Sequence, residues 1–354
     1  MSMTEHAQLG QPDPDRETQQ ASIHDVAQAV GVSVSTVSRS FTRPNLVSPR
    51  TREKVLRAAA ELHFSISRSA MALKSGRSFR IALLLPSPIT EWFNVNVYAG
   101  LNEVLQPAGY DISVFQISTN DARHRFFSEM PVRRNADAVV LCSFNTREDE
   151  LSLLLGMGVP VVGINTSSLV GLDAGTSIDD VKSAEIATKH LISLGHRNIA
   201  YIYTSHDTPF TYSADDRHEG FENAIRDSHA DVSTVTISCP YDHNPVDACL
   251  TQLINLDPQP TALFFQTDDL AIPVMMRLGR YGKRVPRDYS IIGFDDIPSA
   301  RDIGLTTMHQ NPHYLGVSGA QKVLNLIESK SMDNAFENPT ARLVLRQTTS
   351  PIDD

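Results

Sequence analysis

The sequence predicts a small all-α head followed by a larger α/β body that contains doubly wound parallel sheets. Three observations predict this division of the 354 residues. Capped helical segments around a glycine turn lie between residues 21 and 63, short apolar runs alternate with helical stretches from Arg80 onward, and the net charge changes sign between these parts. Residues 1–20, which are rich in glutamine, proline and acidic side chains, are expected to form a disordered lead-in.

The first helix is predicted to begin after Ser22, whose hydroxyl can cap it, while Asp25 complements the exposed N–H groups. Gly31 follows at the position where a glycine accepts a positive φ, and Ser33 can cap a second helix after a short turn. This arrangement is typical of a helix-turn-helix. The apolar face of the first helix follows the spacing i, i+3, i+4, i+7 and comprises Ile23, Val26, Ala27 and Val30.

The second helix is expected to have one buried and one outward face. At about 100° per residue, Val37 and Phe41 lie together on the buried side. A polar surface with a stray charge is common on any helix, so this pattern alone does not indicate a binding face. The outward arc comprises Ser35, Ser38 and Arg39, with Val34 at its border.

A third helix supports the interpretation of this segment as a compact binding head. Ser48 can cap it, and Pro49 suits its first position because a proline has no N–H to leave unpaired there. Three short helices can then close on one small core. The expected core stripe of the third helix comprises Val55, Ala59 and Leu62.

The charge of the head indicates the chemistry of its partner. Residues 21–80 contain ten lysine and arginine residues against three aspartate and glutamate residues, a net charge of +7, whereas residues 81–354 carry −14. An acidic chain with one basic segment is attracted to phosphate through that segment alone. The expected partner is therefore nucleic acid.

Three stretches of the head closely resemble the lactose and galactose repressor (LacI/GalR) family: Ile23 to Ser33, Thr36 to Arg39, and Val47 to Val55. The resemblance implies that Val34, Ser35 and Arg39 read base edges in the major groove, where an arginine can donate to both O6 and N7 of guanine. It implies mainly phosphate contacts, which set the register on DNA, for Ser22, His24, Ser33, Thr36, Ser38, Thr42, Ser48 and Thr51.

The same resemblance implies a hinge helix within residues 64–79. Leu73 matches a leucine that this family inserts into the minor groove, and Ala70 matches its helical neighbour. The alternative is an ordinary linker helix, in which this leucine would pack in a core and not contact DNA. Ile66, Ser67 and Met71 depart from the family pattern, which usually has proline, asparagine and a basic residue there.

From Arg80 the apolar, β-branched runs predict two parallel sheets covered by helices on both faces. The segments Ile178 to Ala200 and Arg217 to Phe221 resemble the LacI/GalR family as well, which implies a body like a periplasmic sugar-binding protein. Its two lobes would be residues 80–177 with 310–333 and residues 178–309 with 334–354, joined near Ser177, near His309 and around residues 331–336. The expected strands are Ile81–Leu85, Ile112–Gln116, Ala138–Cys142, Val161–Ile164, Ile199–Tyr203, Val232–Ile237, Ala262–Phe265 and Ser290–Phe294.

A ligand site is expected between the lobes, because open parallel sheets bind ligands beyond the carboxyl ends of their strands. Carboxylates, a guanidinium and an indole suit a sugar-like ligand. Each residue also has an ordinary alternative: Asp295 as a loop cap, Arg217 as an ion-pair partner, and Trp92 as a packing residue. The candidates from strand ends are Trp92, Phe93, Asn94, Asn165, Asp268 and Asp295, with Arg217 on a helix. By resemblance, effector contacts are implied for Asn165, Arg217, Asp268, Asp295 and Gln310, although the family often has asparagine at Asp268.

An enzyme is the weaker interpretation. Four aspartate pairs, at residues 179–180, 215–216, 268–269 and 295–296, lie where strands turn into helices, and helix capping explains them better than glycoside hydrolysis or metal binding. No zinc-helix, phosphate-loop or nucleophile-elbow motif occurs in the sequence, so neither a metal nor a cofactor is expected. Three cysteines without a Cys-x-x-Cys pair, no signal segment and no long apolar run predict a cytoplasmic protein without a membrane span.

These patterns predict a ligand-responsive transcription regulator, most simply a repressor of double-stranded operator DNA that a small carbohydrate-like effector releases. One head offers little surface, so a homodimer on a palindromic operator is expected, with further pairing to a tetramer left open. Two alternatives remain at this stage. One is a corepressed regulator with a nucleobase or nucleoside effector, and the other is a soluble sugar-binding or sugar-processing protein.

Overall fold

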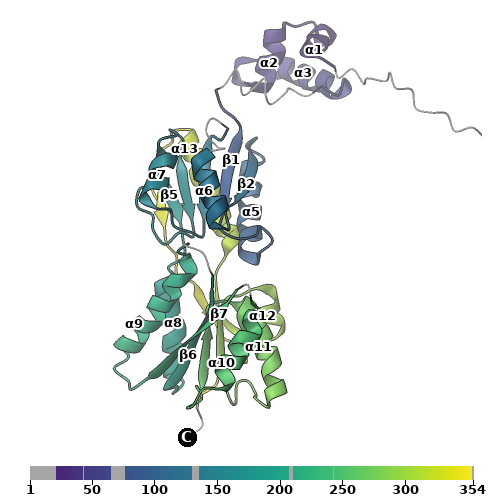
Figure 1. The fold of residues 1–354 in the computed structure, drawn as a ribbon. Helices are drawn as coiled ribbons and strands as arrows, with labels where there is room; N and C mark the ends of the chain where they lie inside the picture. The colour runs from purple at the N-terminus through teal and green to yellow at the C-terminus, as the bar shows by residue number, and fades with distance from the viewer. Residues whose placement is uncertain are drawn as a thin grey trace, which may run out of the picture. The chain divides into compact units, whose positions relative to one another are not determined.

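The computed structural model describes residues 21–42, 44–64, 76–129, 135–206, 210–241 and 243–352. The chain divides into two compact units, Met1–Arg77 and Ser78–Asp354 (Figure 1). The described part of the first unit is the all-α head, and the second unit is the α/β body. The predicted fold class is confirmed for both units.

The head is built from three capped helices around one small core. The side chains of Ser22 and Asp25 form the expected reciprocal cap, Gly31 adopts a φ of 70°, and Ser48 caps the third helix. Val26, Val37 and Val55 are fully buried at the centre. The elements are α1 (Ile23–Val30), α2 (Val34–Thr42), the 3-10 turn η1 (Pro44–Leu46) and α3 (Pro49–Glu61).

One expected core residue of the head lies elsewhere. Leu62 is 36% exposed, so its assignment to the core stripe is wrong. Helix α3 ends at Glu61, and Leu62 follows it as the capping residue, where the backbone leaves the helical path. Phe64 packs against the core in its place, with its ring centre 6.2 Å from that of Phe41.

The first lobe of the body is a six-stranded parallel sheet in the order β11-β5-β4-β3-β1-β2. Alternate residues of its strands face opposite layers: Ile81 and Leu83 pack toward α5 and α13, whereas Ala82 and Leu84 pack toward α6 and α7. Its strands are β1 (Arg80–Leu85), β2 (Asp111–Gln116), β3 (Ala138–Cys142), β4 (Val161–Ile164), β5 (Ala174–Thr176) and β11 (Phe336–Glu337). Its helices are α5 (Trp92–Leu105), α6 (Asn120–Glu129), α7 (Glu148–Leu155) and α13 (Pro312–Ile327).

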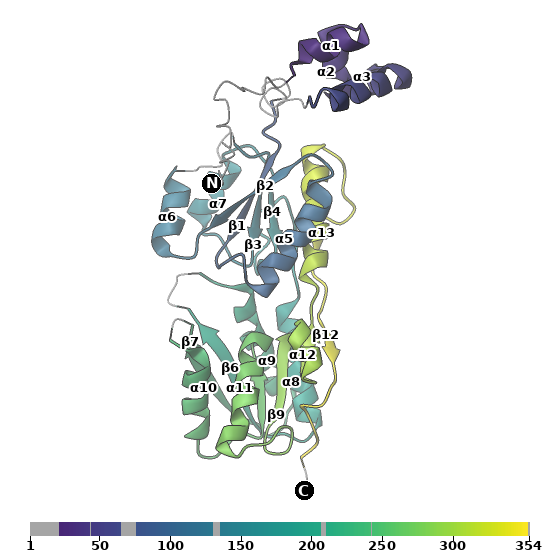
Figure 2. The same cartoon turned by 90° about the vertical axis from the view of Figure 1, so that its right-hand side faces the viewer.

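Helices α5 and α13 lie side by side although more than two hundred residues separate them (Figure 2). Glycines make this close approach possible, because a Cβ atom on Gly100 would lie 2.1 Å from the carbonyl oxygen of His313. A Cβ atom on Gly316 would likewise lie 2.3 Å from the carbonyl oxygen of Val97. The two backbones therefore touch directly, and a larger residue at either glycine would force them apart.

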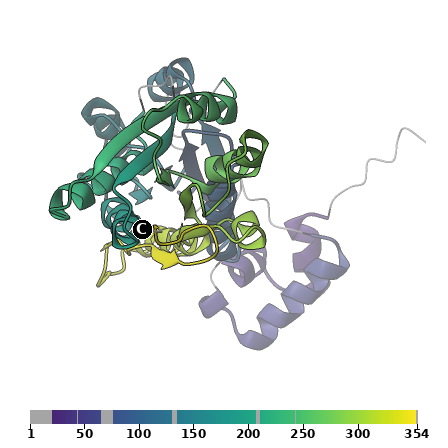
Figure 3. The same ribbon diagram turned by 90° about the horizontal axis from the view of Figure 1, so that it is seen from below.

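The second lobe has a six-stranded sheet in the order β12-β10-β9-β8-β6-β7, parallel except for the antiparallel pair of β10 and β12. Helices α8 and α9 cover one face and α10 to α12 the other (Figure 3). Its strands are β6 (Asn198–Ser205), β7 (Ser233–Pro240), β8 (Ala262–Phe265), β9 (Ser290–Asp295), β10 (Thr306–His309) and β12 (Arg342–Val344). Its helical elements are α8 (Asp180–Ser193), η2 (Ser213–Asp215), α9 (Asp216–Asp227), α10 (Pro245–Ile254), α11 (Asp268–Leu278), η3 (Gly279–Tyr281) and α12 (Pro298–Asp302).

The chain passes between the two sheets after β5, after β10 and after β11. The third passage differs from the expected one around residues 331–336, because Phe336 and Glu337 pair with β5 of the first lobe. Residues 334–337 therefore belong to the first lobe. The first and third passages run together, since the backbone N–H groups of Ser177 and Asp179 donate to the carbonyl oxygens of Glu337 and Pro339.

Candidate functional site

The outward face of α2 carries the residues that the sequence suggests for base reading. Ser35 and Arg39 are exposed, whereas Val37 is fully buried on the opposite side. Val34 is half-buried and packs against the core of the head, as its border position predicts. The face is therefore polar, with one long cationic side chain available to a partner.

Hydroxyl groups gather at the N-termini of the three helices of the head. Ser33 Oγ lies 2.9 Å from Thr36 Oγ1 at the start of α2, and Ser48 Oγ lies 2.8 Å from Thr51 Oγ1 at the start of α3. Helix N-termini carry partial positive charge and suit phosphate oxygens. Of the other expected phosphate contacts, Ser22 caps α1, His24 is exposed and Ser38 is half-buried; the side chain of Thr42 lies outside the described residues, as do Ala70 and Leu73.

The body contains a cavity of about 410 Å³ between the carboxyl ends of its two sheets. The loops after β1, β3 and β4 of the first lobe contribute to it, and so do the strand ends of the second lobe. The direction of the strand order reverses in both sheets at this edge, at β1 in the first lobe and at β6 in the second. The lining side chains include Ser87, Glu91, Phe93, Asn94, Ser143, Asn165, His206, Tyr212, Ser213, Asp215, Arg217, Tyr241, Gln266, Asp269, Asp295 and Gln310.

Three cavity residues end their strands in left-handed backbone conformations. Ser143, Asn165 and Asp295 have φ values of 62°, 52° and 115°. Such values are costly for side chains other than glycine and concentrate at ligand sites, because surrounding structure must hold them. At Asn165 the support is visible: its Nδ2 donates to Ser213 Oγ at 2.7 Å, and its Oδ1 accepts from the N–H of Ile178 at 3.2 Å.

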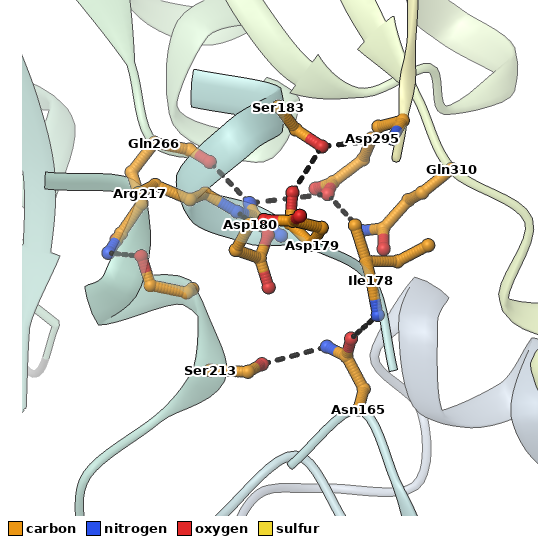
Figure 4. Close-up of polar contacts among 12 residues, drawn as sticks. Asn165, Ile178, Asp179, Asp180, Ser183, Ser213, Arg217, Gln266, Asp295 and Gln310 are labelled. Carbon is orange, nitrogen blue, oxygen red and sulfur yellow. Dashed lines mark hydrogen bonds and ion pairs between the residues drawn. The ribbon is translucent and has the colours of Figure 1, made fainter. Parts of the chain in front are cut away.

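Arg217 is the centre of a buried polar network in the second lobe (Figure 4). Its Nε donates to Asp180 Oδ1 at 2.7 Å, and one terminal nitrogen donates to the carbonyl oxygen of Gln266 at 2.6 Å. The same nitrogen lies 3.5 Å from Asp295 Oδ1, and the guanidinium lies 3.6 Å from the ring centre of Phe294. The charge of Arg217 is thus matched by two carboxylates within the protein.

Asp295 and Gln310 line the cavity together with Arg217. Gln310 Nε2 donates to Asp295 Oδ1 at 2.6 Å, and both side chains are almost fully buried. Burial raises the pKa of Asp295 well above its ordinary range, while the nearby Arg217 opposes this effect. The resulting surface offers a ligand a guanidinium edge, a carboxylate and an amide.

Comparison with known proteins decides the family. Residues 22–67 match the model of the bacterial regulatory proteins of the lacI family, and residues 188–349 match a periplasmic binding protein-like domain. The repressor PurR of Haemophilus influenzae (strain PittEE) is 30% identical over 343 residues, which cover 94% of this chain and 99% of that protein. The chain belongs to the LacI family of bacterial regulatory proteins.

Solved structures agree with this assignment. The lac repressor dimer bound to operator and the anti-inducer ONPF has a TM-score of 0.79 at 23% identity, covering 94% of this chain and 100% of that one. A LacI-family regulator from Enterococcus faecium with bound ribose has a TM-score of 0.67 at 25% identity, covering 77% of this chain and 100% of that one. This LacI-family chain is accordingly a transcriptional repressor with a DNA-binding domain, and its relatives are repressors, not enzymes.

Two residues that the sequence suggests for the LacI-family cleft do not line the cavity. Trp92 packs against the apolar cluster of the second lobe instead, because its position at the start of α5 turns it away from Phe93 and Asn94. Asp268 is fully buried, where Thr307 Oγ1 and the N–H of Ile297 donate to its carboxylate at 2.7 and 3.1 Å. Asp269, its neighbour on α11, lines the cavity.

Three further lining residues are absent from the sequence-based candidates, although each directly follows a strand, as Asn165 does. His206, Tyr241 and Gln266 directly follow β6, β7 and β8. The ring of His206 lies between those of Tyr212 and Tyr241, with centres 4.8 and 4.7 Å apart. These three rings line the cavity together with Arg217.

The aspartate pairs divide between capping and ion pairing. Asp179 caps α8 and Asp215 accepts from the N–H of Tyr212, as the capping interpretation predicts. It is wrong for Asp180, which pairs with Arg217, and for Asp296, which pairs with Arg346 and His309. Among the residues that the structure describes, no group of three or more histidine, cysteine, aspartate or glutamate side chains is placed to hold a metal ion, and no helix is long and apolar enough to cross a membrane.

Proposed function

We propose that this chain is a ligand-responsive repressor that binds a palindromic operator as a homodimer in the cytoplasm and leaves it when a small sugar-like effector enters the cavity. The observation that carries this proposal is the position of the cavity. Loops of both lobes line it, so a ligand there contacts both at once. A ligand that favours one arrangement of the lobes shifts the population of that arrangement.

The lining supports a hydroxyl-rich ligand. Asp295 and Asp269 offer carboxylate oxygens that accept hydrogen bonds from vicinal hydroxyl groups, and Arg217 offers a donor. Phe93, Tyr212 and Tyr241 provide apolar surface for the face of a sugar ring. The ribose bound to the Enterococcus faecium relative supports the same class of ligand.

The head supports sequence-specific binding by Arg39 with Val34 and Ser35, and phosphate binding at the N-termini of α1, α2 and α3. We further propose that residues 64–76 couple the lobes to DNA through hinge helices that place Leu73 in the minor groove. An effector that separates the paired first lobes would dismantle both hinge helices together. Operator affinity would then fall.

A second candidate is a corepressor-dependent regulator with a nucleobase or nucleoside ligand. The cluster of tilted rings formed by Tyr212, His206 and Tyr241 favours it, because aromatic side chains in the lining can pack against a planar base. The two candidates predict opposite effects of the ligand on operator affinity. A corepressor tightens operator binding, whereas an inducer weakens it.

The test combines operator binding with a ligand screen. Footprinting across the promoter beside the gene for this chain, at low salt, should reveal a protected palindrome, and sedimentation should show a dimer. Thermal-shift screening of sugars, polyols and nucleosides should identify a ligand that raises the melting temperature. Absence of binding to every such fragment by folded protein would refute the repressor proposal, and a ligand that strengthens binding would select the corepressor candidate.

A further inference from the structure

The cavity has an unbalanced set of charges. Among the described residues that line it are the carboxyl groups of Glu91, Asp215, Asp269 and Asp295, whereas Arg217 is the one lysine or arginine there. The charge of Arg217 is already matched, since its guanidinium contacts Asp295 and the buried Asp180. Three lining carboxyl groups therefore remain without a lysine or arginine partner in the lining.

Two of these carboxyl groups come from opposite lobes. Glu91 precedes α5 of the first lobe, and its hydrogen-bond partners are neutral: Ser87 Oγ donates to it at 2.6 Å and the Tyr241 hydroxyl at 3.4 Å. Asp269 lies in the first turn of α11 of the second lobe. Loss of solvation raises the pKa of Glu91, and the charge of Asp269 adds to this effect. Both groups therefore line the same cavity, each from a different lobe.

Helix N-termini offset only part of this charge. Glu91 and Asp269 both lie at helix starts, where the peptide dipoles are equivalent to roughly half a positive charge. Glu91 makes no capping hydrogen bond to its helix, and loss of solvation raises the pKa of Asp269, although the residue as a whole is exposed. Capping thus leaves a net negative charge in the lining.

An unpaired acceptor lies beside these groups. Among the described residues none donates a hydrogen bond to Gln310 Oε1, although the side chain is only 3% exposed and lines the cavity. Its amide nitrogen is already engaged with Asp295. A buried acceptor without a donor is costly, so this atom indicates a ligand that donates hydrogen bonds.

We propose that the effector carries a positive charge and is a polyhydroxylated molecule with a protonated amine, of which an amino sugar is the simplest example. This inference rests on the proposed function of the cavity and specifies its ligand. A ligand that fills the cavity removes water from Glu91, Asp215 and Asp269. Hydroxyl groups replace the lost hydrogen bonds but leave the negative charge unmatched, whereas an ammonium group supplies both donors and charge.

The aromatic side chains of the lining fit the same ligand. Phe93, Tyr212 and Tyr241 line the cavity together with the acidic side chains. Their ring faces attract a cation, and they also cover the apolar face of a sugar ring. A cationic ligand thus meets acidic and aromatic side chains in the same cavity.

The test uses full-length protein and matched ligands. D-glucosamine, D-galactosamine and D-mannosamine are compared with their parent hexoses and their N-acetyl derivatives by thermal shift and calorimetry at equal ionic strength. At least one amine should bind about tenfold or more tightly than both of its neutral counterparts, as expected when a charge-assisted contact replaces a neutral one. Equal or tighter binding of the neutral partners, or binding of none of the amines, would overturn the proposal.

Isosteric variants assign the effect to the carboxyl groups that line the cavity from the two lobes. Glu91→Gln and Asp269→Asn should each weaken binding of the amine about tenfold while changing binding of the parent hexose much less. The matched controls Glu222→Gln and Asp149→Asn, whose side chains are 58% and 70% exposed, should leave amine binding unchanged. Retention of full amine affinity by both cavity variants would refute the assignment.

Operator binding separates this inference from the proposed function. A neutral sugar that binds the cavity and releases operator would leave the repressor proposal intact and refute the cationic ligand. Failure of ligand-free protein to bind any operator fragment would refute the repressor proposal, whereas amine binding in the cavity would still establish the ligand class.

Discussion

The guanidinium of Arg123 lies 4.4 Å from the centre of the Phe210 ring, so an arginine of the first lobe holds an aromatic side chain of the second. Glu150 fixes Arg123 in turn through a hydrogen bond of 2.7 Å from Nε. Phe210 is only 7% exposed within the first-lobe core. Trp92 makes the reciprocal contact with the apolar cluster of the second lobe. Aromatic side chains of each lobe thus pack into the apolar cluster of the other.

Replacement of Phe210 by alanine should lower the free energy of unfolding by ~3 kcal/mol, the usual cost of truncating a buried phenylalanine. The loss arises from an empty space beside Arg123 and from the lost cation–π contact. Urea denaturation at neutral pH measures it. The control is Phe336→Ala, whose side chain is 44% exposed and whose loss should be smaller. Equal losses in both variants would contradict the insertion of Phe210 into the first lobe.

A second prediction concerns the contribution of the buried pair of Arg217 and Asp180 to stability. Arg217→Ala should destabilise the chain by ~3–5 kcal/mol, because it leaves the carboxylates of Asp180 and Asp295 buried without their partner. The double variant Arg217→Ala with Asp180→Asn should lose less than the single variant, since one of these charges is then removed. Urea denaturation of both variants measures the difference. A double variant that loses as much stability as Arg217→Ala, or more, would contradict this interaction.

The buried carboxyl group of Asp268 should make the free energy of unfolding depend on pH. Burial raises its pKa from an ordinary value of 3.8 to about 7. Between these values the folded state binds more protons than the unfolded state, so this group's contribution to stability falls as the pH rises from about 4 to 7. Asp268→Asn does not titrate and should therefore gain stability relative to the parent between pH 4 and pH 8, by at most ~4 kcal/mol.

Chemical denaturation of parent and Asp268→Asn at both pH values measures this gain. Asparagine suits the site because its amide oxygen can accept from the N–H of Ile297, and its NH₂ group can donate to Thr307 Oγ1. Asp149→Asn, at an exposed position, serves as the control and should show no such gain. A constant difference between Asp268→Asn and the parent at both pH values would refute the raised pKa.

Arg39 and Thr51 should affect operator binding differently. Arg39→Ala should relax the preference at one base pair in each half-site at a cost of ~1–3 kcal/mol, because its exposed guanidinium can pair with a base edge. Thr51→Ala, at the N-terminus of α3, should weaken binding to all sequences alike. A panel of operators with single base-pair changes distinguishes these outcomes. A uniform loss for Arg39→Ala would place base reading elsewhere on the head.

Ligand and operator should weaken each other by the same factor if the effector acts through two lobe arrangements. Calorimetry of the ligand identified by screening, with and without saturating operator, gives one factor. Operator titration with and without saturating ligand gives the other. Unequal factors would show that the two measurements do not report one linked equilibrium.

Local patterns predicted most strands but missed the short ones. The apolar runs Ala138–Cys142, Val161–Ile164 and Ala262–Phe265 are strands with those same bounds. Ala174–Thr176 and Thr306–His309 contain too few apolar residues to stand out, yet both are strands because a neighbouring strand pairs with them. Pairing is a tertiary property that no local pattern contains.

Local sequence patterns also predict the lining of the cavity only in part. Strand ends predicted Asn165 and Asp295 correctly as lining residues, because parallel strands expose their carboxyl ends at one edge. Trp92 was assigned wrongly, since a rotation of about 100° per residue at the start of a helix decides which neighbour faces the cavity. The sequence predicts a helix cap at Asp180, because no local pattern contains its pairing with Arg217, which lies 37 positions away.

The sequence by itself determined the class of this protein: helix caps, a glycine turn and apolar periodicity are local properties, and together they predicted the helix-turn-helix head and the parallel sheets. Only the tertiary structure decided how the cavity is lined. Burial and charge compensation depend on groups that the fold brings together from distant positions. The fold of the second lobe therefore decides the neutralisation of Arg217 by Asp180, and a cavity lined by both Glu91 and Asp269 exists only where the two lobes meet.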